Sequence, residues 1–309
     1  MSYETPQIRA FYKGDTTKSR EKLMDNNVSD YEALIVAKHL IEDRIEAIVK
    51  DRNRRILESD KWYRTSKTKR LASYLANLGY RILDCKFKEE KVSHVGIAKL
   101  LFNNRARAVP LVKMLAHMKE DTYTLSFEGM AGVEKNGLIQ LCGAFEKCGW
   151  ASCEKTKNEL KIIRRNKKCA VQFWNGTWAE LANKWIVEKT LEDYARQKRL
   201  KFDVFTDVKL AKIEQEKSQA DMQLDVVAML QDRVYVFETK TGKMLGLDKW
   251  VDRARMFCSD MRSRFVTCCA DDNVPCNLFK PFDMVPLSSL AKWLWMCLEK
   301  DRSAGVSPC

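Results

Sequence analysis

The sequence predicts an α/β protein with a mixed central sheet flanked by helices. Three observations predict this fold class. Apolar residues recur with helical period after Gly176, and residues 202–210 alternate apolar and polar side chains as a half-buried strand does. Two runs rich in β-branched and aromatic residues, 224–230 and 234–240, flank a short polar break and predict a hairpin.

The segments after the hairpin continue this pattern. Residues 247–261 are rich in Arg and Asp and suit a helix. The short apolar run over 264–269 follows as a strand, which we expect to be parallel to its neighbour. The C-terminal half therefore has the order helix, strand, hairpin, helix, strand.

The N-terminal half is predicted to be mainly helical. Residues 29–57 form one long amphipathic helix, and residues 66–79 form a second that ends at Gly79, a suitable C-cap. Short helices and strands follow in turn: a strand over 80–85, helices over 96–102 and 110–118, and a strand over 122–127. A helix over 137–148 and a hairpin with strands at 150–153 and 159–163 are typical of a winged helix.

We therefore expect three parts. Residues 1–136 form an N-terminal helical or α/β region, residues 137–170 a winged-helix-like linker, and residues 171–309 the C-terminal domain. A chain of 309 residues that is 45% apolar is long enough to bury two cores. It contains no internal repeat and no low-complexity linker, so these parts are expected to pack together.

The hairpin carries three charges among apolar residues. If its two-residue loop is Asp232-Arg233, then Asp225 lies opposite Lys240 and Val227 lies opposite Glu238, and all four side chains share one face. Cross-strand neighbours on one face lie roughly 5 Å apart at Cβ. Two carboxylates and an ammonium group would therefore meet in a small volume.

Carboxylates held this close repel each other unless a cation lies between them. Hard oxygen ligands suit Mg²⁺ or Mn²⁺, and a metal with open positions can bind water and a phosphate oxygen. Lys240 could then stabilise the developing negative charge. The alternative is an ordinary cross-strand salt bridge on a partly exposed hairpin.

The pattern Asp-x12-Glu-x-Lys from Asp225 to Lys240, followed by Thr-Gly-Lys, resembles the PD-(D/E)xK nuclease superfamily. The segments Asn-Gly-Thr-Trp-Ala-Glu at 175–180 and Phe-Glu-Thr-Lys-Thr-Gly at 237–242 are similar to the nuclease domain of CRISPR-accessory endonucleases activated by cyclic oligoadenylate. The resemblance implies a restriction-endonuclease-like core over the C-terminal domain. It leaves the N-terminal region unexplained.

The resemblance also implies roles for individual residues. Asp225, Glu238 and Lys240 would form the catalytic triad, and Glu180 would complete the metal site from the first helix. Glu180 has an alternative role, because an acidic residue near a helix N-terminus is favourable to the helix dipole. The chain departs from the pattern at Gln223, where related nucleases often carry an acidic residue.

The expected activity is that of a metal-dependent endonuclease acting on DNA in defence against foreign DNA, with RNA as the alternative substrate and a homodimer as the expected assembly. Two other hypotheses stay open. The protein could be a catalytically inactive nucleic-acid-binding module. It could also be an effector activated by a cyclic oligonucleotide, with residues 124–132 as a diverged glycine loop of a Rossmann-like sensor.

The net charge of +13 is concentrated in two stretches. Residues 51–100 carry +7 and residues 151–200 carry +6. Such clusters suit a polyanion, although a solvated helix face is the alternative. The residues expected to bind nucleic acid are Arg64, Lys67, Lys69, Arg70, Arg164, Arg165, Lys167, Lys168 and Lys243.

The composition argues against a membrane protein, a secreted protein and a histidine-based site. No apolar run approaches the length of about 20 residues that spans a bilayer, and the N-terminus does not have the pattern of a signal peptide. We therefore expect a cytoplasmic protein without a membrane partner. The 11 cysteines are expected to be reduced, and three isolated histidines make a histidine-based site a poor candidate.

Overall fold

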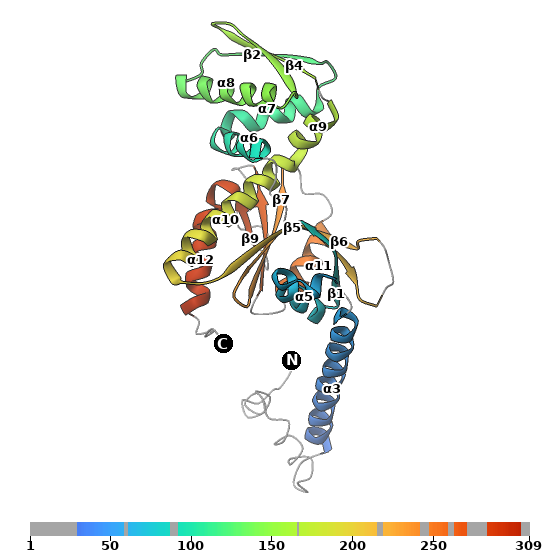
Figure 1. The fold of residues 1–309 in the computed structure, drawn as a ribbon. Helices are drawn as coiled ribbons and strands as arrows, with labels where there is room; N and C mark the ends of the chain where they lie inside the picture. The colour runs from blue at the N-terminus through green and yellow to red at the C-terminus, as the bar shows by residue number, and fades with distance from the viewer. Residues whose placement is uncertain are drawn as a thin grey trace. The chain divides into compact units, whose positions relative to one another are not determined.

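A computed structural model describes residues 30–58, 61–86, 92–165, 167–214, 219–241, 247–258, 263–270 and 283–303 (Figure 1). The predicted α/β class is confirmed, because a six-stranded mixed sheet and a three-stranded sheet are combined with helices. The chain divides into two compact units. The first comprises residues 1–81 with 212–216, and the second comprises residues 82–211 with 217–309.

The first unit is helical. It contains α3 (Asp30–Glu58), α4 (Lys61–Arg64) and α5 (Ser66–Asn77), so both predicted N-terminal helices are confirmed. Asn53 is buried, and its Nδ2 donates a hydrogen bond to the carbonyl of Ala76 at 3.0 Å, which holds α3 on α5. Gly79 ends α5 with φ of 81°, a conformation that glycine adopts without strain.

The second unit begins with a helical module carrying a small antiparallel sheet. Its elements are α6 (Val92–Asn103), α7 (Arg105–His117), β2 (Thr122–Ser126), α8 (Gly132–Lys147), β3 (Ala151–Lys155) and β4 (Glu159–Arg164). The strand order is β2-β4-β3, and both pairings are antiparallel. We refer to residues 92–164 as the helix–sheet module.

The structure differs from the expected domain boundaries and from the expected setting of the glycine loop. The expected boundaries at 136/137 and 170/171 both fall inside helices, since α8 spans the first and α9 (Lys167–Gln172) spans the second. The helix–sheet module begins near residue 92, since α8 packs against both α6 and α7. The expected glycine loop at 124–132 begins inside β2, which lies in an antiparallel sheet and not in the parallel sheet of a Rossmann-like sensor.

The large sheet has the order β1-β5-β6-β7-β8-β9. Its strands are β1 (Tyr80–Lys86), β5 (Phe202–Lys212), β6 (Met222–Leu230), β7 (Arg233–Lys240), β8 (Ser263–Cys269) and β9 (Asp283–Pro286). β5, β6 and β7 are antiparallel to one another, and β7, β8 and β9 are parallel, as expected for β8. β9 was not predicted, and β1 comes from outside the expected C-terminal domain.

Helices cover both faces of this sheet (Figure 1). A short π-helix, η1 (Phe173–Thr177), leads into α10 (Trp178–Lys198), which packs against α12 (Leu287–Ser303). On the other face lies α11 (Leu247–Cys258), which packs against β8. α12 was not predicted from the sequence. One hydrophobic core runs from the helix–sheet module through Trp174 and Trp178 into the six-stranded sheet.

Among the described helices, none combines the length and apolar character that crossing a membrane requires.

Candidate active site

The register of the β6–β7 hairpin differs from the expected one. Leu230 pairs with Arg233, so the two-residue loop is Gln231-Asp232 and not Asp232-Arg233. The pairing of Val226 with Phe237 fixes a register two residues away from the expected one. A shift of two residues leaves every side chain on its original face, whereas a shift of one would reverse the faces. Extending this register by one position places Asp225 opposite Glu238.

The contacts of β7 show which face each residue occupies. The hydroxyl groups of Tyr235 and Thr239 bond to Asp301 of α12 and to Asn183 of α10, respectively. Glu238 bonds instead to Arg253 of α11. Because residues alternate along a strand, Lys240 shares the α11 face with Glu238.

Two carboxylates form the centre of the site. Glu238 is only 3% exposed, and its Oε1 accepts a hydrogen bond from Nη1 of Arg253 at 3.1 Å. Asp225 is half-buried, and its Oδ2 accepts a hydrogen bond from the backbone N–H of Thr239 at 2.7 Å. One oxygen of each carboxylate, Oδ1 of Asp225 and Oε2 of Glu238, accepts no hydrogen bond in the described part of the chain.

The pKa of Glu238 is raised from 4.5 to about 8, mainly by burial and then by the neighbouring charge of Asp225. Burial likewise raises the pKa of Asp225, although the hydrogen bond from Thr239 and the charge of Lys240 oppose the shift. Folding therefore holds these two carboxyl groups where their negative charges are costly. A bound cation would remove that cost.

Glu180 approaches this pair from the first turn of α10. Its pKa is raised to about 7, first by burial and then by the charge of Asp225, while Lys240 lowers it. The electrostatic coupling links a residue of α10 to residues of the hairpin. A carboxyl group that titrates near neutral pH can accept a proton from water during a reaction.

A fourth carboxylate, Asp207 of β5, was missed by the sequence reasoning. The pairs Thr206–Val226 and Val208–Leu224 place Asp207 directly across from Asp225. Asp207 has φ of 50°, a left-handed conformation that Asp tolerates better than most residues. It forms an ion pair with Lys86 of β1, and its charge raises the pKa of both Glu180 and Asp225.

Asp207 also contacts Gln223, the residue that stands where nucleases of the resembled superfamily often carry an acidic residue. The Nε2 of Gln223 donates a hydrogen bond to Oδ1 of Asp207 at 3.0 Å. An acidic group therefore lies beside position 223, on the neighbouring strand. The signal available in the sequence was an acidic residue in the middle of the alternating run 202–210.

The expected set of three carboxylate ligands is not assembled. Within the described ranges, no three side chains of His, Cys, Asp or Glu lie close enough to hold one ion together. Asp225 and Glu238 remain as a pair with one oxygen each available. Mg²⁺ is commonly held by one or two carboxylates together with water and substrate phosphate, so this pair fits such an ion.

A further polar group beside the pair has no hydrogen-bond partner among the described residues. Thr267 of β8 stands next to Glu238 in the parallel ladder, and its Oγ1 is buried without a hydrogen bond. Buried polar atoms without partners are rare in folded proteins and often indicate a missing water or ion. This observation agrees with the fit of a hydrated cation near Glu238.

The structure separates the basic residues into several groups. In the first unit, Arg64, Lys67 and Lys69 are exposed on α4 and α5, and Arg70 is half-buried. Arg64 donates its Nε to the carbonyl of Glu58, and Lys69 lies over the ring of Tyr63. In the second unit, Arg165 and Lys168 are exposed. The side chain of Lys167 and the whole of Lys243 lie outside the described residues.

Arg164 was expected to bind nucleic acid, but the structure places it elsewhere. Its side chain is only 8% exposed, and its guanidinium donates hydrogen bonds to the carbonyls of Leu115 and Met118. It also pairs with Asp121 at 3.3 Å. These contacts hold β4 against the end of α7, so Arg164 stabilises the helix–sheet module and is not available to a phosphate.

Comparison with known proteins gives a likeness of fold. No family model matches the sequence, and no curated protein matches it significantly. Among solved structures, the chain is similar to protein VC1899 from Vibrio cholerae, with 17% identity and a TM-score of 0.50. The match covers 77% of this chain and 62% of that one. At this identity, the likeness shows a shared fold and nothing about activity.

Proposed function

We propose that this protein is a divalent-metal-dependent nuclease that hydrolyses phosphodiester bonds of DNA. The observation that carries the proposal is the meeting of Asp225, Glu238 and Lys240 on one face of the β6–β7 hairpin. Both carboxyl groups have raised pKa values, and each keeps one oxygen free of hydrogen bonds in the described part of the chain. A folded protein gains little from such an arrangement unless a cation binds there.

In this proposal Asp225 and Glu238 hold Mg²⁺ or Mn²⁺. The metal would polarise the phosphate and make a bound water more acidic. Lys240 stabilises the negative charge that develops on the phosphate oxygens. Arg253 fixes the orientation of Glu238, and Glu180 accepts the proton of the attacking water, for which its pKa near 7 is suited.

Further features support the proposal. The sheet order, the hairpin and the N-terminus of α10 agree with a restriction-endonuclease-like core, which the sequence resemblance implies. Exposed lysines and arginines on α4, α5 and α9 suit a nucleic acid. A homodimer would supply two active sites for cutting two strands. The nine cysteines within the described ranges are free, which suits a cytoplasmic enzyme of foreign-DNA defence.

A cleavage assay tests the proposal. Purified protein is incubated with plasmid, single-stranded DNA and RNA in Mg²⁺, in Mn²⁺ and in EDTA. We expect metal-dependent cleavage of DNA by the wild type and its loss in Lys240→Ala and Asp225→Asn. Lys209→Ala is the matched control, because this partly exposed lysine of β5 pairs with Asp84 at 3.6 Å. Cleavage by both site variants at the wild-type rate would refute the proposal.

A second candidate function is nucleic-acid binding without catalysis. It is favoured by one observation, namely that no three potential ligands converge in the described part of the chain. It predicts salt-sensitive DNA binding and no cleavage with either metal. The same assay also tests activation by a ligand, since a cyclic oligoadenylate can be added to each reaction. The antiparallel setting of β2 has removed the structural argument for a Rossmann-like sensor at 124–132.

A further inference from the structure

Helix α3 of the first unit carries an exposed apolar stripe. Every residue from 41 to 49 is exposed, whereas the C-terminal part of the helix is held on α5 by Asn53. Large apolar side chains of α3 that are between 45% and 68% exposed are Leu34, Ile41, Ile45, Ile48 and Val49. The first four recur at spacings of seven, four and three residues, so they lie along one side of the helix. We refer to these four residues as the α3 stripe.

The composition of the α3 stripe is unfavourable for a helix surrounded by water. Isoleucine has a lower helix propensity than alanine, leucine or lysine. Most of the stability of a helix in a folded protein comes from packing its apolar face against a neighbour. A contiguous group of exposed apolar side chains is typical of a surface that binds another molecule. The α3 stripe therefore indicates a partner.

The charges of α3 indicate which partner fits. Residues 30–46 contain five acidic and two basic residues, and residues 47–58 contain four basic and two acidic residues. Two copies of α3 that pack in the same direction would bring like charges together. Two copies that pack in opposite directions bring the acidic half of each helix against the basic half of the other. The helix is therefore complementary to an antiparallel second copy of itself.

The α3 stripe allows two registers for such a pair. In one, the two-fold axis passes between Ile45 and Ile48, so each Ile45 meets Ile48 of the second copy. This register places Arg44 beside Asp51 of the second copy, twice by symmetry. In the other, the axis passes between Ile41 and Ile45, and Arg44 faces its own equivalent. Like charges across a helix pair are unfavourable, so the first register is preferred.

The surroundings of Asp51 can accept a second helix. The Oδ2 of Asp51 pairs with Nη2 of Arg55 on its own helix at 2.7 Å, and a carboxylate has further acceptor positions for Arg44 of the second copy. An open depression beside the α3 stripe gives room for the side chains of that helix. Among the described residues, its lining consists of Arg44, Ala47, Ile48, Asp51, Arg52 and Arg55.

We propose that two copies of this protein associate through antiparallel pairing of their α3 helices, with Ile45 against Ile48 and Arg44 against Asp51 at the centre. This surface uses no residue of the candidate active site. The inference rests on the proposed function only for the use of two active sites in one assembly, and the pairing itself does not require catalysis.

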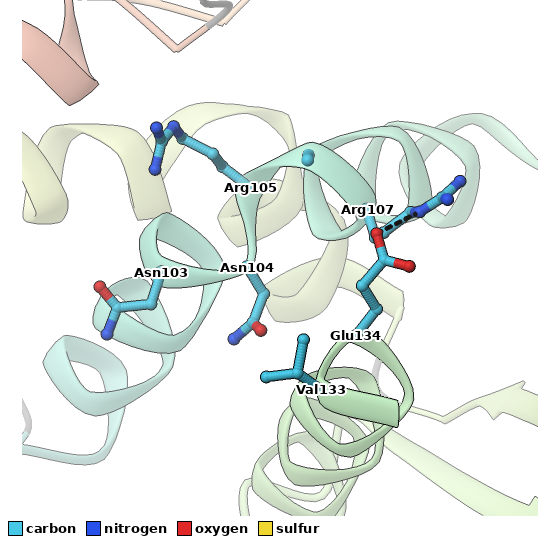
Figure 2. A pocket seen from close by; sticks show the side chains of 7 residues that line it. Asn103, Asn104, Arg105, Arg107, Val133 and Glu134 are labelled. Carbon is cyan, nitrogen blue, oxygen red and sulfur yellow. Dashed lines mark hydrogen bonds and ion pairs between the residues drawn. The ribbon is translucent and has the colours of Figure 1, made fainter. Parts of the chain in front are cut away.

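Sedimentation equilibrium of the full-length protein over a range of concentrations tests the surface. We expect the wild type to reach twice the chain mass of 35.9 kDa. Ile41→Asp with Ile45→Asp should give the mass of one chain, because charged groups in the stripe cannot be buried without cost. Val133→Asp is the matched control and should stay dimeric. Val133 is 77% exposed, and it lines a separate cavity at the start of α8 beside Asn104 (Figure 2).

The register is tested by exchanging charges. Arg44→Glu sets two acidic residues against each other in the pair, and Asp51→Arg sets two arginines against each other. Each variant alone should have a dissociation constant raised at least about tenfold. An equal mixture of the two variants should form a mixed dimer as tight as the wild type, because every contact then joins opposite charges. Neither a parallel pair nor a different surface predicts this rescue.

The outcomes separate this inference from the proposed function. A wild type with the mass of one chain at every concentration overturns the inference, as does a dimer that the stripe variant leaves intact. Charge variants that stay weak when mixed also overturn it. A dimer formed through α3 in a protein that never cuts DNA supports the inference and refutes the proposed nuclease activity. Cleavage of DNA by a protein that stays monomeric refutes the inference alone.

Discussion

Arg253 of α11 donates Nη1 to Oε1 of Glu238 at 3.1 Å, and Glu238 is the most buried carboxylate of the candidate active site. The arginine supplies the positive charge that a buried carboxylate requires. It leaves the second oxygen of Glu238 available. The pair thus keeps the site folded before any metal binds.

Replacement of Arg253 tests this role. In EDTA above pH 8, where Glu238 is charged, Arg253→Met should lower the free energy of unfolding by about 3 kcal/mol, since breaking a buried pair leaves one charge alone. Added Mg²⁺ should raise the melting temperature of the variant more than that of the wild type. Arg255→Met is the control, because Arg255 is 71% exposed on the same helix. An equal response of variant and wild type to Mg²⁺ would contradict the role.

The raised pKa of Glu238, about 8, predicts how stability depends on pH. The folded state binds this proton more tightly than the unfolded state, whose carboxyl has the ordinary pKa of 4.5. The free energy of unfolding of the metal-free protein should therefore fall as pH rises from about 4.5 to about 8.

Urea denaturation in EDTA across this pH range measures the effect. Glu238→Gln should show a shallower fall than the wild type, because its amide does not titrate. Saturating Mg²⁺ should flatten the wild-type curve, since the ion favours the charged carboxylate. Identical slopes for wild type and Glu238→Gln would show that this carboxyl group does not control stability.

Glu180 is predicted to transfer a proton. Glu180→Gln should lower the rate of DNA cleavage by roughly 10²–10⁴-fold while leaving DNA affinity unchanged. The wild-type rate should rise with pH through about 7, where Glu180 loses its proton, and the variant should lack this step. Glu188→Gln on the same helix is the control, because Glu188 lies beside Lys184 and is not among the charges that act on the site. A variant that keeps both the rate and the pH step would assign Glu180 to the helix dipole alone.

Asp301 of α12 is predicted to be structural. It is buried, accepts hydrogen bonds from Tyr235 and Arg264, and forms an ion pair with Arg233 at 3.2 Å. Burial acts to raise its pKa, but hydrogen bonds from Arg264 and Tyr235 outweigh burial and lower it. Its contribution to stability is therefore present at neutral pH and is lost as pH falls through the lowered pKa.

Asp301→Asn should destabilise the protein by about 3–5 kcal/mol at pH 7, because two arginines lose their buried partner. Chemical denaturation measures this loss. Asp252→Asn, at a position 77% exposed, should change stability by less than about 1 kcal/mol. Cleavage per folded molecule should be unchanged, since Asp301 lies on the face of the sheet opposite to Glu238. A large loss of activity in folded Asp301→Asn would contradict this separation.

The sequence determined which elements form and which side chains share a face. Periods of two and 3.6 residues arise from local backbone geometry, so the long first helix, the hairpin and the common face of Asp225, Glu238 and Lys240 could all be predicted. The common face was predicted although the predicted loop of the hairpin was wrong. A register error of two residues leaves each side chain on the same face of the sheet.

The tertiary structure alone decided which distant groups meet. Nothing near Asp207 in the chain indicates that β5 pairs with β6 so as to place this acid across from Asp225. Nothing near Arg164 indicates that it is buried against the end of α7. Strand pairing and burial depend on contacts between segments far apart in the chain, and local periodicity carries no information about them. The electrostatics of the candidate active site therefore depend on the fold, whereas its residue types could be recognised from the sequence.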